Sequence, residues 1–209
     1  MTASPERAPA GVTLEAGIAA RSTAMPGWMR ARLLELDALD QATYRAVARP
    51  TAPALDAAVT RLSNAANYSR LWLTIAAGLA LLGRRQRRGA LLGVAAIALA
   101  SVTANLVVKP ALLRRRPDPA EVVLPEGRQV RMPGSSSFPS GHSASAFAFA
   151  SAVGHELPAT RLPLRLLAGA VAYSRVRTGV HYPIDVLAGS ILGTACAAAV
   201  RRLGRPRRT

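Results

Sequence analysis

Three separated stretches of this 209-residue sequence carry residue types that bind an anion and move a proton. They are KPALLRRRP (109–117), PSGH (139–142) and SRVRTGVHYPID (174–185). Each stretch lies beside a long apolar segment, where charged groups are costly and usually mark function. If the apolar segments alternate in direction, all three stretches fall at the same side of a helical bundle. Together they can then line one pocket.

The basic residues in these stretches indicate that the ligand is a phosphate group. Lys109, Arg116 and Arg175 supply positive charge, and a guanidinium group matches phosphate oxygens in planar, bidentate geometry. Ser140 is a typical N-cap residue, and Gly141 lets the backbone approach a ligand closely. The helix that follows would direct its first N–H groups at the same anion.

Two histidines and one aspartate add acid–base and nucleophilic chemistry. His181 and Asp185 are four residues apart, and Pro183 between them suits the first turn of a helix. A carboxylate at this spacing can fix the imidazole tautomer and stabilise its cation, which would make His181 a nucleophile. His142, at the start of another helix, is placed to give or take a proton.

Each stretch also has a simpler interpretation when it is taken alone. RRRP is typical of a basic patch that binds lipid headgroups beside a membrane, and PSGH is typical of a turn with a helix cap. A histidine near a helix end can be an interfacial residue, and Asp185 can act only as a cap. The roles of Arg114, Arg115 and Ser135 to Ser137 stay open, because the arginines fit either a second phosphate or lipid headgroups.

The apolar segments that position these residues predict an all-α integral membrane bundle with about five to six transmembrane helices. Half of the residues are hydrophobic, and a bilayer crossing needs roughly 20 apolar residues. The five predicted spans are 71–83, 89–108, 143–154, 162–174 and 183–200. We expect residues 84–88 to form a basic loop and Pro110 to end the second span.

The remaining segments flank a predicted membrane core of residues 69–202. Residues 1–27 predict a disordered or loosely ordered tail, and residues 203–209 predict a basic tail. Residues 28–68 predict amphipathic helices at the membrane interface or against the bundle, with a further span and the side of the N-terminus left open. Cytoplasmic loops are enriched in Lys and Arg, so we expect 84–88 in the cytoplasm and the 109–142 loop outside.

Together, the three stretches resemble the signature of the type 2 phosphatidic acid phosphatase (PAP2) superfamily. That signature is a lysine, six residues and Arg-Pro; then Pro-Ser-Gly-His; then Ser-Arg, five residues, His, three residues and Asp. Every fixed position has a counterpart here, in the same order and at the same spacing, and the resemblance covers roughly residues 69–200. Residues 1–68 carry no family motif.

The resemblance implies a role for each site residue. His181 would attack phosphorus and form a phosphohistidine, while Asp185 would orient His181 and stabilise its charge. His142 would protonate the leaving oxygen and then help to activate water. The residues that would hold the phosphoryl oxygens are Lys109, Arg116, Ser140, Gly141 and Arg175. The resemblance implies no metal and no other cofactor.

The protein implied by this resemblance is a bacterial, multi-pass membrane phosphatase with an extracytoplasmic site. Its substrate would be a polyprenyl diphosphate, phosphatidic acid, phosphatidylglycerol phosphate or a polyprenyl-phosphosugar phosphate. The formal net charge of +16 predicts an anionic partner, and we expect lipid phosphate and the bilayer rather than nucleic acid. The sequence does not indicate an oligomeric state.

Two other functions compete with this interpretation. A vanadium-dependent haloperoxidase shares the same pocket, but those relatives are soluble and the apolar spans argue against one. A non-enzymatic basic membrane protein that binds anionic lipid explains the net charge, but it does not explain a histidine and an aspartate at catalytic spacing.

Overall fold

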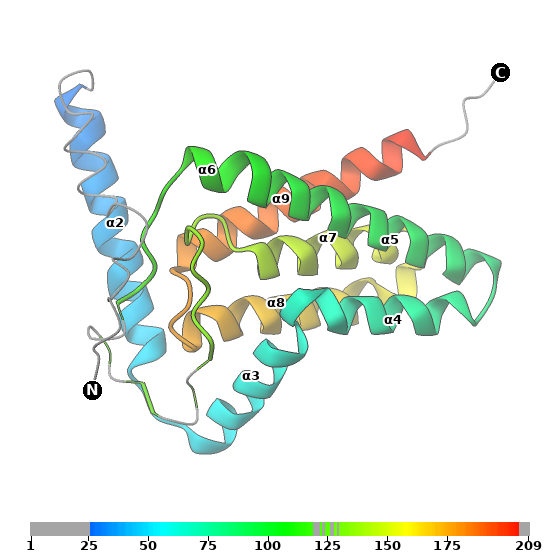
Figure 1. The fold of residues 1–209 in the computed structure, drawn as a ribbon, viewed down its shortest axis with the longest axis horizontal. Helices are drawn as coiled ribbons and strands as arrows, with labels where there is room; N and C mark the ends of the chain where they lie inside the picture. Colours follow the sequence, from blue (N-terminus) through cyan, green and yellow to red (C-terminus); the bar gives the residue numbers. More distant parts are fainter. Residues whose placement is uncertain (1–25, 119–121, 123, 126–127, 129, 205–209) are drawn as a thin grey trace, which may run out of the picture.

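The computed structural model describes residues 26–118, 122, 124, 125, 128 and 130–204, and these residues confirm the all-α class (Figure 1). The helices are α2 (Gly27–Ala48), α3 (Pro53–Ala65), α4 (Arg70–Ala80), α5 (Arg84–Val102), α6 (Lys109–Ala111), α7 (Gly141–Glu156), α8 (Arg161–Arg177) and α9 (Pro183–Leu203). Short 3-10 turns join α3 to α4 (Asn67–Ser69) and α7 to α8 (Pro158–Thr160). A π-helical segment, Thr103–Val108, joins α5 to α6. Of the predicted tails, 1–27 and 203–209, residues 1–25 and 205–209 lie outside the described residues, while Gly27 begins α2 and Leu203 ends α9.

Helix α7 is the centre of the bundle and contacts α5, α8 and α9 along its length. Its sequence, GHSASAFAFASAVGHE, consists mainly of small residues, most of them buried. Small side chains let helix backbones come close together in a membrane. A Cβ atom added to Gly193 of α9 would overlap the carbonyl oxygen of Ala144, and one on Gly189 would overlap that of Ser140. The backbones of α7 and α9 are therefore in direct contact.

The outward surfaces of the bundle helices are apolar. Large exposed side chains include Leu73 on α4, Leu91 and Leu99 on α5, Leu166 on α8, and Leu187 and Ile191 on α9. A contiguous exposed apolar surface marks contact with a membrane or a partner. Among the described residues, the helical stretches Arg84–Ala111 and Pro183–Leu203 are long and apolar enough to cross a bilayer. The five predicted spans correspond to α4, α5, α7, α8 and α9, and the number that cross the membrane stays a prediction.

Two details predicted for the second span were wrong. Residues 84–88 form the first turns of α5 instead of a loop, because arginine favours helix and the connection is only Leu81–Gly83. Pro110 does not end the helix, which continues to Ala111. The preceding π segment is wider than an α-helix, so the chain passes Pro110 without the usual clash with the carbonyl four residues earlier.

Helices α2 and α3 lie across the end of the bundle at which α7 and α9 begin (Figure 1). Asp56 of α3 forms ion pairs with Arg177 of α8 at 2.8 Å and with Arg128 at 3.2 Å. Tyr44 of α2 packs edge-on against Tyr182, with ring centroids 5.5 Å apart. All five side chains are buried, so α2 and α3 are fixed parts of this end of the bundle.

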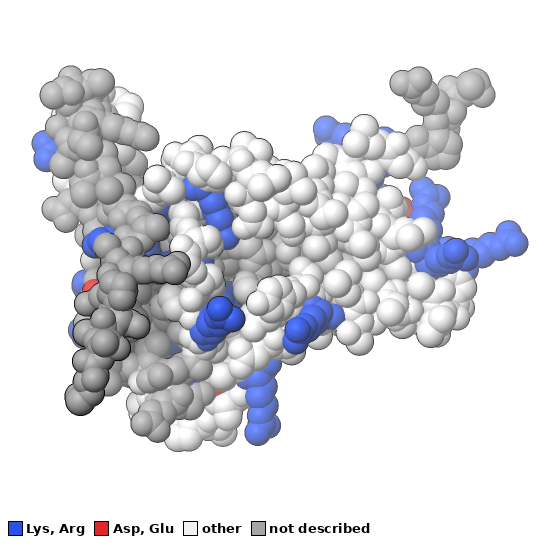
Figure 2. Space-filling view, viewed as in Figure 1, with Lys and Arg blue, Asp and Glu red and all other residues white. Residues whose placement is uncertain are grey.

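The opposite end of the bundle is basic. Helix α5 begins with Arg84, Arg85, Arg87 and Arg88, and α9 ends with Arg201 and Arg202. In Figure 2, blue side chains gather at the right-hand end, where α4 joins α5. The two ends of the bundle thus differ in character, and the sequence-predicted site residues all lie at the end away from this basic cluster.

Candidate active site

The predicted site residues line or surround one pocket at the end of the bundle that α2 and α3 cover. The pocket has a volume of about 450 Å³. Helix α5 and its extension bring Lys109, the start of α7 brings Gly141 and His142, and two loops bring Arg116 and His181. Residues far apart in the sequence therefore meet at one cavity, as their predicted positions at helix ends require.

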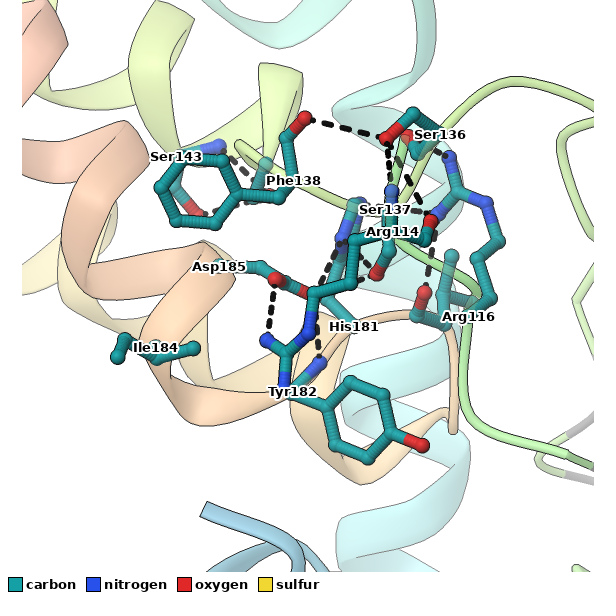
Figure 3. A network of polar contacts seen from close by, with 12 residues as sticks. Arg114, Arg116, Ser136, Ser137, Phe138, Ser143, His181, Tyr182, Ile184 and Asp185 are labelled. Atoms are coloured by element: carbon teal, nitrogen blue, oxygen red, sulfur yellow. Dashed lines mark hydrogen bonds and ion pairs between the residues drawn. The ribbon is translucent and has the colours of Figure 1, made fainter. Parts of the chain in front are cut away.

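His181 is buried in the loop before α9, with its two ring nitrogens in different surroundings (Figure 3). Nδ1 lies 3.5 Å from a carboxylate oxygen of Asp185, and Nε2 lies 3.2 Å from Nη1 of Arg116. A guanidinium can only donate, so Nε2 accepts and the ring proton is on Nδ1. Burial lowers the pKa of His181 to about 4, although the hydrogen bond with Asp185 opposes this shift. At neutral pH the ring is therefore neutral, with its lone pair directed toward Arg116.

Asp185 is fully buried in the first turn of α9, and both of its carboxylate oxygens have partners. Oδ2 accepts hydrogen bonds from the hydroxyl of Ser137 and from the backbone N–H of Tyr182, the latter at 2.9 Å. Oδ1 accepts a hydrogen bond from Nη1 of Arg114 at 2.7 Å. These contacts fix the carboxylate beside His181 and show that it does more than cap its helix.

Arg116 and Lys109 are held around a single serine. Nε of Arg116 donates to the carbonyl of Ser135 at 3.0 Å, and Nη1 donates to the carbonyl of Val180 at 2.9 Å. Lys109 Nζ donates to the Ser135 hydroxyl at 3.3 Å and would lie 3.9 Å from a Cβ atom on Gly141. Burial lowers the pKa of Arg116 to about 10, so the guanidinium stays charged at neutral pH. Lys109 therefore faces the start of α7, and Arg116 faces His181.

Arg175 lies behind the pocket wall and is 2% exposed. Its Nη1 donates a short hydrogen bond to the hydroxyl of Ser63 on α3. Within the described part of the chain, its buried Nε atom has no hydrogen-bond partner. A buried guanidinium nitrogen without a partner is costly, so this arginine is suited to an anionic ligand.

The first turn of α7 combines a cap with an acid–base group. Ser140 accepts a hydrogen bond from the Ser143 backbone N–H at 3.4 Å, as predicted for an N-cap, and its hydroxyl also accepts from the Ser143 hydroxyl at 3.1 Å. His142 Nε2 lies 2.9 Å from Oδ1 of Asn67. The amide oxygen can only accept, so His142 carries its proton on Nε2. Its proton therefore lies at the pocket wall, which Asn67 also lines.

Arg114, whose role the sequence left open, is the centre of a buried ionic cluster. Figure 3 shows its guanidinium beside Asp185 and Tyr182. Its guanidinium pairs with Asp185 at 2.7 Å, with Asp40 at 2.7 Å and with Asp37 at 3.1 Å. It also lies 4.4 Å from the ring centroid of Tyr182. Arg114 thus connects α2 to the aspartate beside His181 and cannot bind a second phosphate in this arrangement.

Asp40 completes this connection at the start of α9. Its Oδ1 accepts a hydrogen bond from the backbone N–H of Ile184 at 2.8 Å, which is one of the N–H groups that a helix leaves without an internal partner. Together with Ser63 and Asn67, it shows that residues 28–68 supply partners to the site. No motif in that segment signals these contacts, and only the polar residues in otherwise apolar helix faces could have suggested them.

The arrangement can bind an anion and carry out phosphoryl transfer. It presents the three cations Lys109, Arg116 and Arg175, the start of a helix, an unprotonated histidine nitrogen beside a carboxylate, and a second histidine that carries a proton. Within the described residues, no group of three or more His, Cys, Asp or Glu side chains is arranged to hold a metal ion.

Comparison with known proteins agrees with this chemistry. The family model for the PAP2 superfamily matches residues 89–208. That match spans more than half of the chain, so the chain belongs to the PAP2 superfamily. The resemblance predicted from the three motifs is confirmed.

Curated relatives of the chain are phosphatases. Decaprenylphosphoryl-5-phosphoribose phosphatase of Mycobacterium tuberculosis (strain H37Rv) is 34% identical over 154 residues, which are 73% of this chain and 82% of that protein. The enzyme of the same name from Mycolicibacterium smegmatis is 34% identical over 132 residues, which are 61% and 67% of the two chains. These relatives support a phosphatase and give no support to the haloperoxidase alternative.

Two solved structures share the fold. LpxE of Aquifex aeolicus superposes with a TM-score of 0.66 at 24% identity, covering 78% of this chain and 95% of that one. The transmembrane PAP2-type phosphatidylglycerolphosphate phosphatase of Bacillus subtilis superposes with a TM-score of 0.65 at 25% identity, covering 94% of each chain. The second match includes the N-terminal helices, since it covers nearly the whole chain.

Proposed function

We propose that this chain is an integral membrane phosphatase that removes the terminal phosphate of a lipid-linked substrate through a phosphohistidine intermediate. The orientation of His181 carries the proposal. Its Nδ1 lies beside Asp185 at 3.5 Å, and its Nε2 lies 3.2 Å from the guanidinium of Arg116. A phosphoryl group that binds Arg116 would lie next to the unprotonated nitrogen.

In the first step, Nε2 of His181 attacks phosphorus, and the bond from phosphorus to the leaving oxygen breaks as the N–P bond forms. Burial and the neighbouring cations lower the pKa of His142, and a bound phosphate dianion offsets those cations, so His142 enters this step as an imidazolium. It donates its Nε2 proton to the leaving oxygen and becomes neutral, while Asp185 stabilises the resulting positive charge on His181. In the second step, water attacks phosphorus, His142 takes a proton from it, and the N–P bond breaks. Inorganic phosphate leaves, and His181 returns to its neutral form.

The cations of the site stabilise charge in both steps. Lys109 and Arg116 at the pocket and Arg175 behind its wall surround the position of the phosphoryl oxygens, and the first N–H groups of α7 point to the same place. Preorganised donors of this kind contribute most of the transition-state stabilisation in phosphoryl transfer. No step of the proposed mechanism uses a metal ion.

The relatives favour a phosphorylated, lipid-linked sugar as the substrate. The mycobacterial phosphatases are named for a 5-phosphoribose carried on decaprenyl phosphate. We infer that this chain hydrolyses the phosphomonoester on the sugar and leaves the lipid-linked sugar as product. Phosphatidic acid, phosphatidylglycerol phosphate and polyprenyl diphosphate are the comparison substrates.

Phosphate release from a panel of these four lipid classes by purified protein tests the proposal. Wild-type protein should release phosphate, and His181→Ala and Asp185→Ala should abolish most of the activity. With a substrate that carries ³²P in its terminal phosphate, denaturing the protein in alkali during turnover should trap ³²P on wild-type protein. His181→Ala should trap none. The proposed mechanism would be refuted if His181→Ala kept its activity. It would also be refuted if wild-type protein released phosphate from none of the four lipid classes.

We also propose that the pocket opens on the extracytoplasmic face. The basic cluster of Arg84 to Arg88, Arg201 and Arg202 lies at the other end of the bundle, where the enrichment of basic residues in cytoplasmic loops would place it. A cysteine introduced at Gly134, at the pocket rim, should react with a membrane-impermeant thiol reagent in intact cells. Reaction only after lysis would reverse the topology.

A further inference from the structure

One wall of the pocket is lined by uncharged polar side chains that the proposed phosphoryl transfer does not use. They are Asn67, Ser69, Ser101, Asn105 and Ser145. They come from three separate elements: the turn before α4, the end of α5 with its π segment, and α7. Amide and hydroxyl groups that converge from several elements are suited to a ligand that carries hydroxyl groups, since a hydrocarbon chain would leave them unpaired.

This polar wall lies on the side of the leaving group. Asn67 is 2.9 Å from His142 Nε2, which is the atom placed to protonate the leaving oxygen. Ser145 is three residues after His142 on α7, and residues at this spacing share a helix face. The wall therefore contacts whatever is attached to the oxygen that His142 protonates.

The part of the wall on α5 places polar groups in an otherwise apolar helix. Polar side chains within a membrane span are expensive and mark function. Asn105 lies in the π-helical segment Thr103–Val108, and π segments occur frequently at functional sites. Asn105 Nδ2 donates to the backbone carbonyl of Ser101 at 2.9 Å, which fixes the amide group at the pocket.

The turn on the other side of the wall has an unusual backbone. Tyr68 and Ser69 have φ values of 55° and 60°, in the left-handed region that residues other than glycine seldom adopt. Residues held in such conformations cluster at ligand clamps and active sites. This turn keeps Asn67 against His142 and places Ser69 at the pocket.

We propose that Ser101, Asn105 and Ser145 form a leaving-group subsite that binds the hydroxyl groups of a sugar. The proposal rests on the phosphatase function proposed above and adds the residues that recognise the alcohol that is released. A site built to bind hydroxyl groups rejects a leaving group that lacks them, because its own polar groups then stay unpaired. The enzyme should therefore prefer a glycosyl phosphomonoester to a diacylglycerol phosphate.

The test measures kcat/KM on two substrates in the same detergent micelles: farnesylphosphoryl-5-phosphoribose, whose leaving alcohol is a sugar, and dioleoyl phosphatidic acid, whose leaving alcohol is diacylglycerol. Asn105→Leu and Ser145→Ala should each lower the ratio of the sugar to the diacylglycerol substrate by about tenfold, as expected for one lost hydrogen bond to a bound hydroxyl. Thr103→Val is the matched control, because Thr103 lies on the same segment, donates to its own helix at Leu99, and does not line the pocket. Its ratio should equal that of wild-type protein.

An unchanged ratio in both subsite variants would overturn the subsite. An equal loss on both substrates would also overturn it, because that result indicates a general structural role. Failure of the proposed function itself looks different: wild-type protein would release phosphate from neither substrate, or His181→Ala would keep its activity. Ser145→Ala removes only a hydroxyl, so it keeps the test decisive if Asn105→Leu does not fold.

Discussion

Replacing Arg114 by Gln tests whether α2 fixes the carboxylate of Asp185. Arg114 is 7% exposed and pairs with three carboxylates, at 2.7 Å from Asp185, 2.7 Å from Asp40 and 3.1 Å from Asp37. Burial acts to lower the pKa of Arg114, but Asp185 and Asp40 outweigh it and raise the pKa above its usual value. The arginine is therefore always charged, and its removal leaves three buried carboxylates without a cation.

The expected magnitude follows from this geometry. Two unit charges 4 Å apart attract by about 4 kcal/mol at an effective dielectric constant of 20, and removing one partner of a buried pair costs about 3–5 kcal/mol. We expect Arg114→Gln to lower the free energy of unfolding by about that amount. It should also lower kcat more than it raises KM, because Asp185 loses the contact that fixes Oδ1 while the phosphate-binding cations are unchanged.

A second substitution separates charge from shape. Asp40→Asn removes one negative charge but keeps an oxygen that can accept from the Ile184 N–H. In the Asp40→Asn background, Arg114→Gln should cost about 1–3 kcal/mol less than it does alone, which is the coupling expected for residues in one ionic network. Arg32→Gln is the control, because Arg32 pairs with Glu35 on the exposed face of α2, the helix that carries Asp40. Exposed ion pairs of this kind contribute about 0–1 kcal/mol.

Thermal unfolding in detergent gives the four stabilities of the cycle, and phosphate release gives kcat and KM. Two results would show that the ionic cluster does not stabilise this end of the bundle. In the first, Arg114→Gln has the same free energy of unfolding as Arg32→Gln. In the second, the stability losses of Arg114→Gln and Asp40→Asn are additive. Either result would refute a role for α2 in positioning Asp185. A loss of stability with unchanged kcat would show that the cluster is structural only.

Three further predictions concern pH, helix packing and metal. Burial lowers the pKa of His181 to about 4, so wild-type protein should lose stability between about pH 6.5 and 4, where the unfolded chain gains a proton; His181→Gln should lose less over this range, with the remaining loss due to His142, whose pKa burial also lowers, and an identical pH dependence of stability in the two proteins would contradict the burial of His181. Gly193→Ala should cost at least about 1–3 kcal/mol, because its Cβ would lie 2.8 Å from the backbone nitrogen of Ala148, whereas Gly169→Ala, with nothing within 4 Å, should unfold like wild-type protein. Phosphate release should be unaffected by EDTA and inhibited by vanadate; a strict requirement for added magnesium would exclude the proposed mechanism.

The sequence predicted the part of the site that lies in contiguous motifs. His142, His181, Lys109 and Arg116 meet at the pocket, because each is next to a helix end and alternating helices bring those ends together. The all-α class followed from apolar segments of the right length. These inferences need only local pattern and helix direction.

The supporting contacts could not be predicted in the same way. Asp40, Ser63 and Asn67 contact Arg114, Arg175 and His142 across more than 70 residues of sequence, and no local pattern encodes such a distance. The error at Pro110 has a different cause, since the rule for proline assumes a preceding α-helix and the segment directly before Lys109 is π-helical. Arg114 was left open because its partners lie on α2 and α9.

The contact between α7 and α9 has a consequence for how this enzyme can change over evolutionary time. His142 is at the start of one helix, His181 directly precedes the other, and the two backbones touch at Gly189 and Gly193. Spacing set by backbone contact does not drift when core side chains are exchanged, because no side chain separates the helices. Substitutions in the outer wall of the pocket can therefore change which alcohol is recognised, while the spacing between the proposed acid and the proposed nucleophile stays the same.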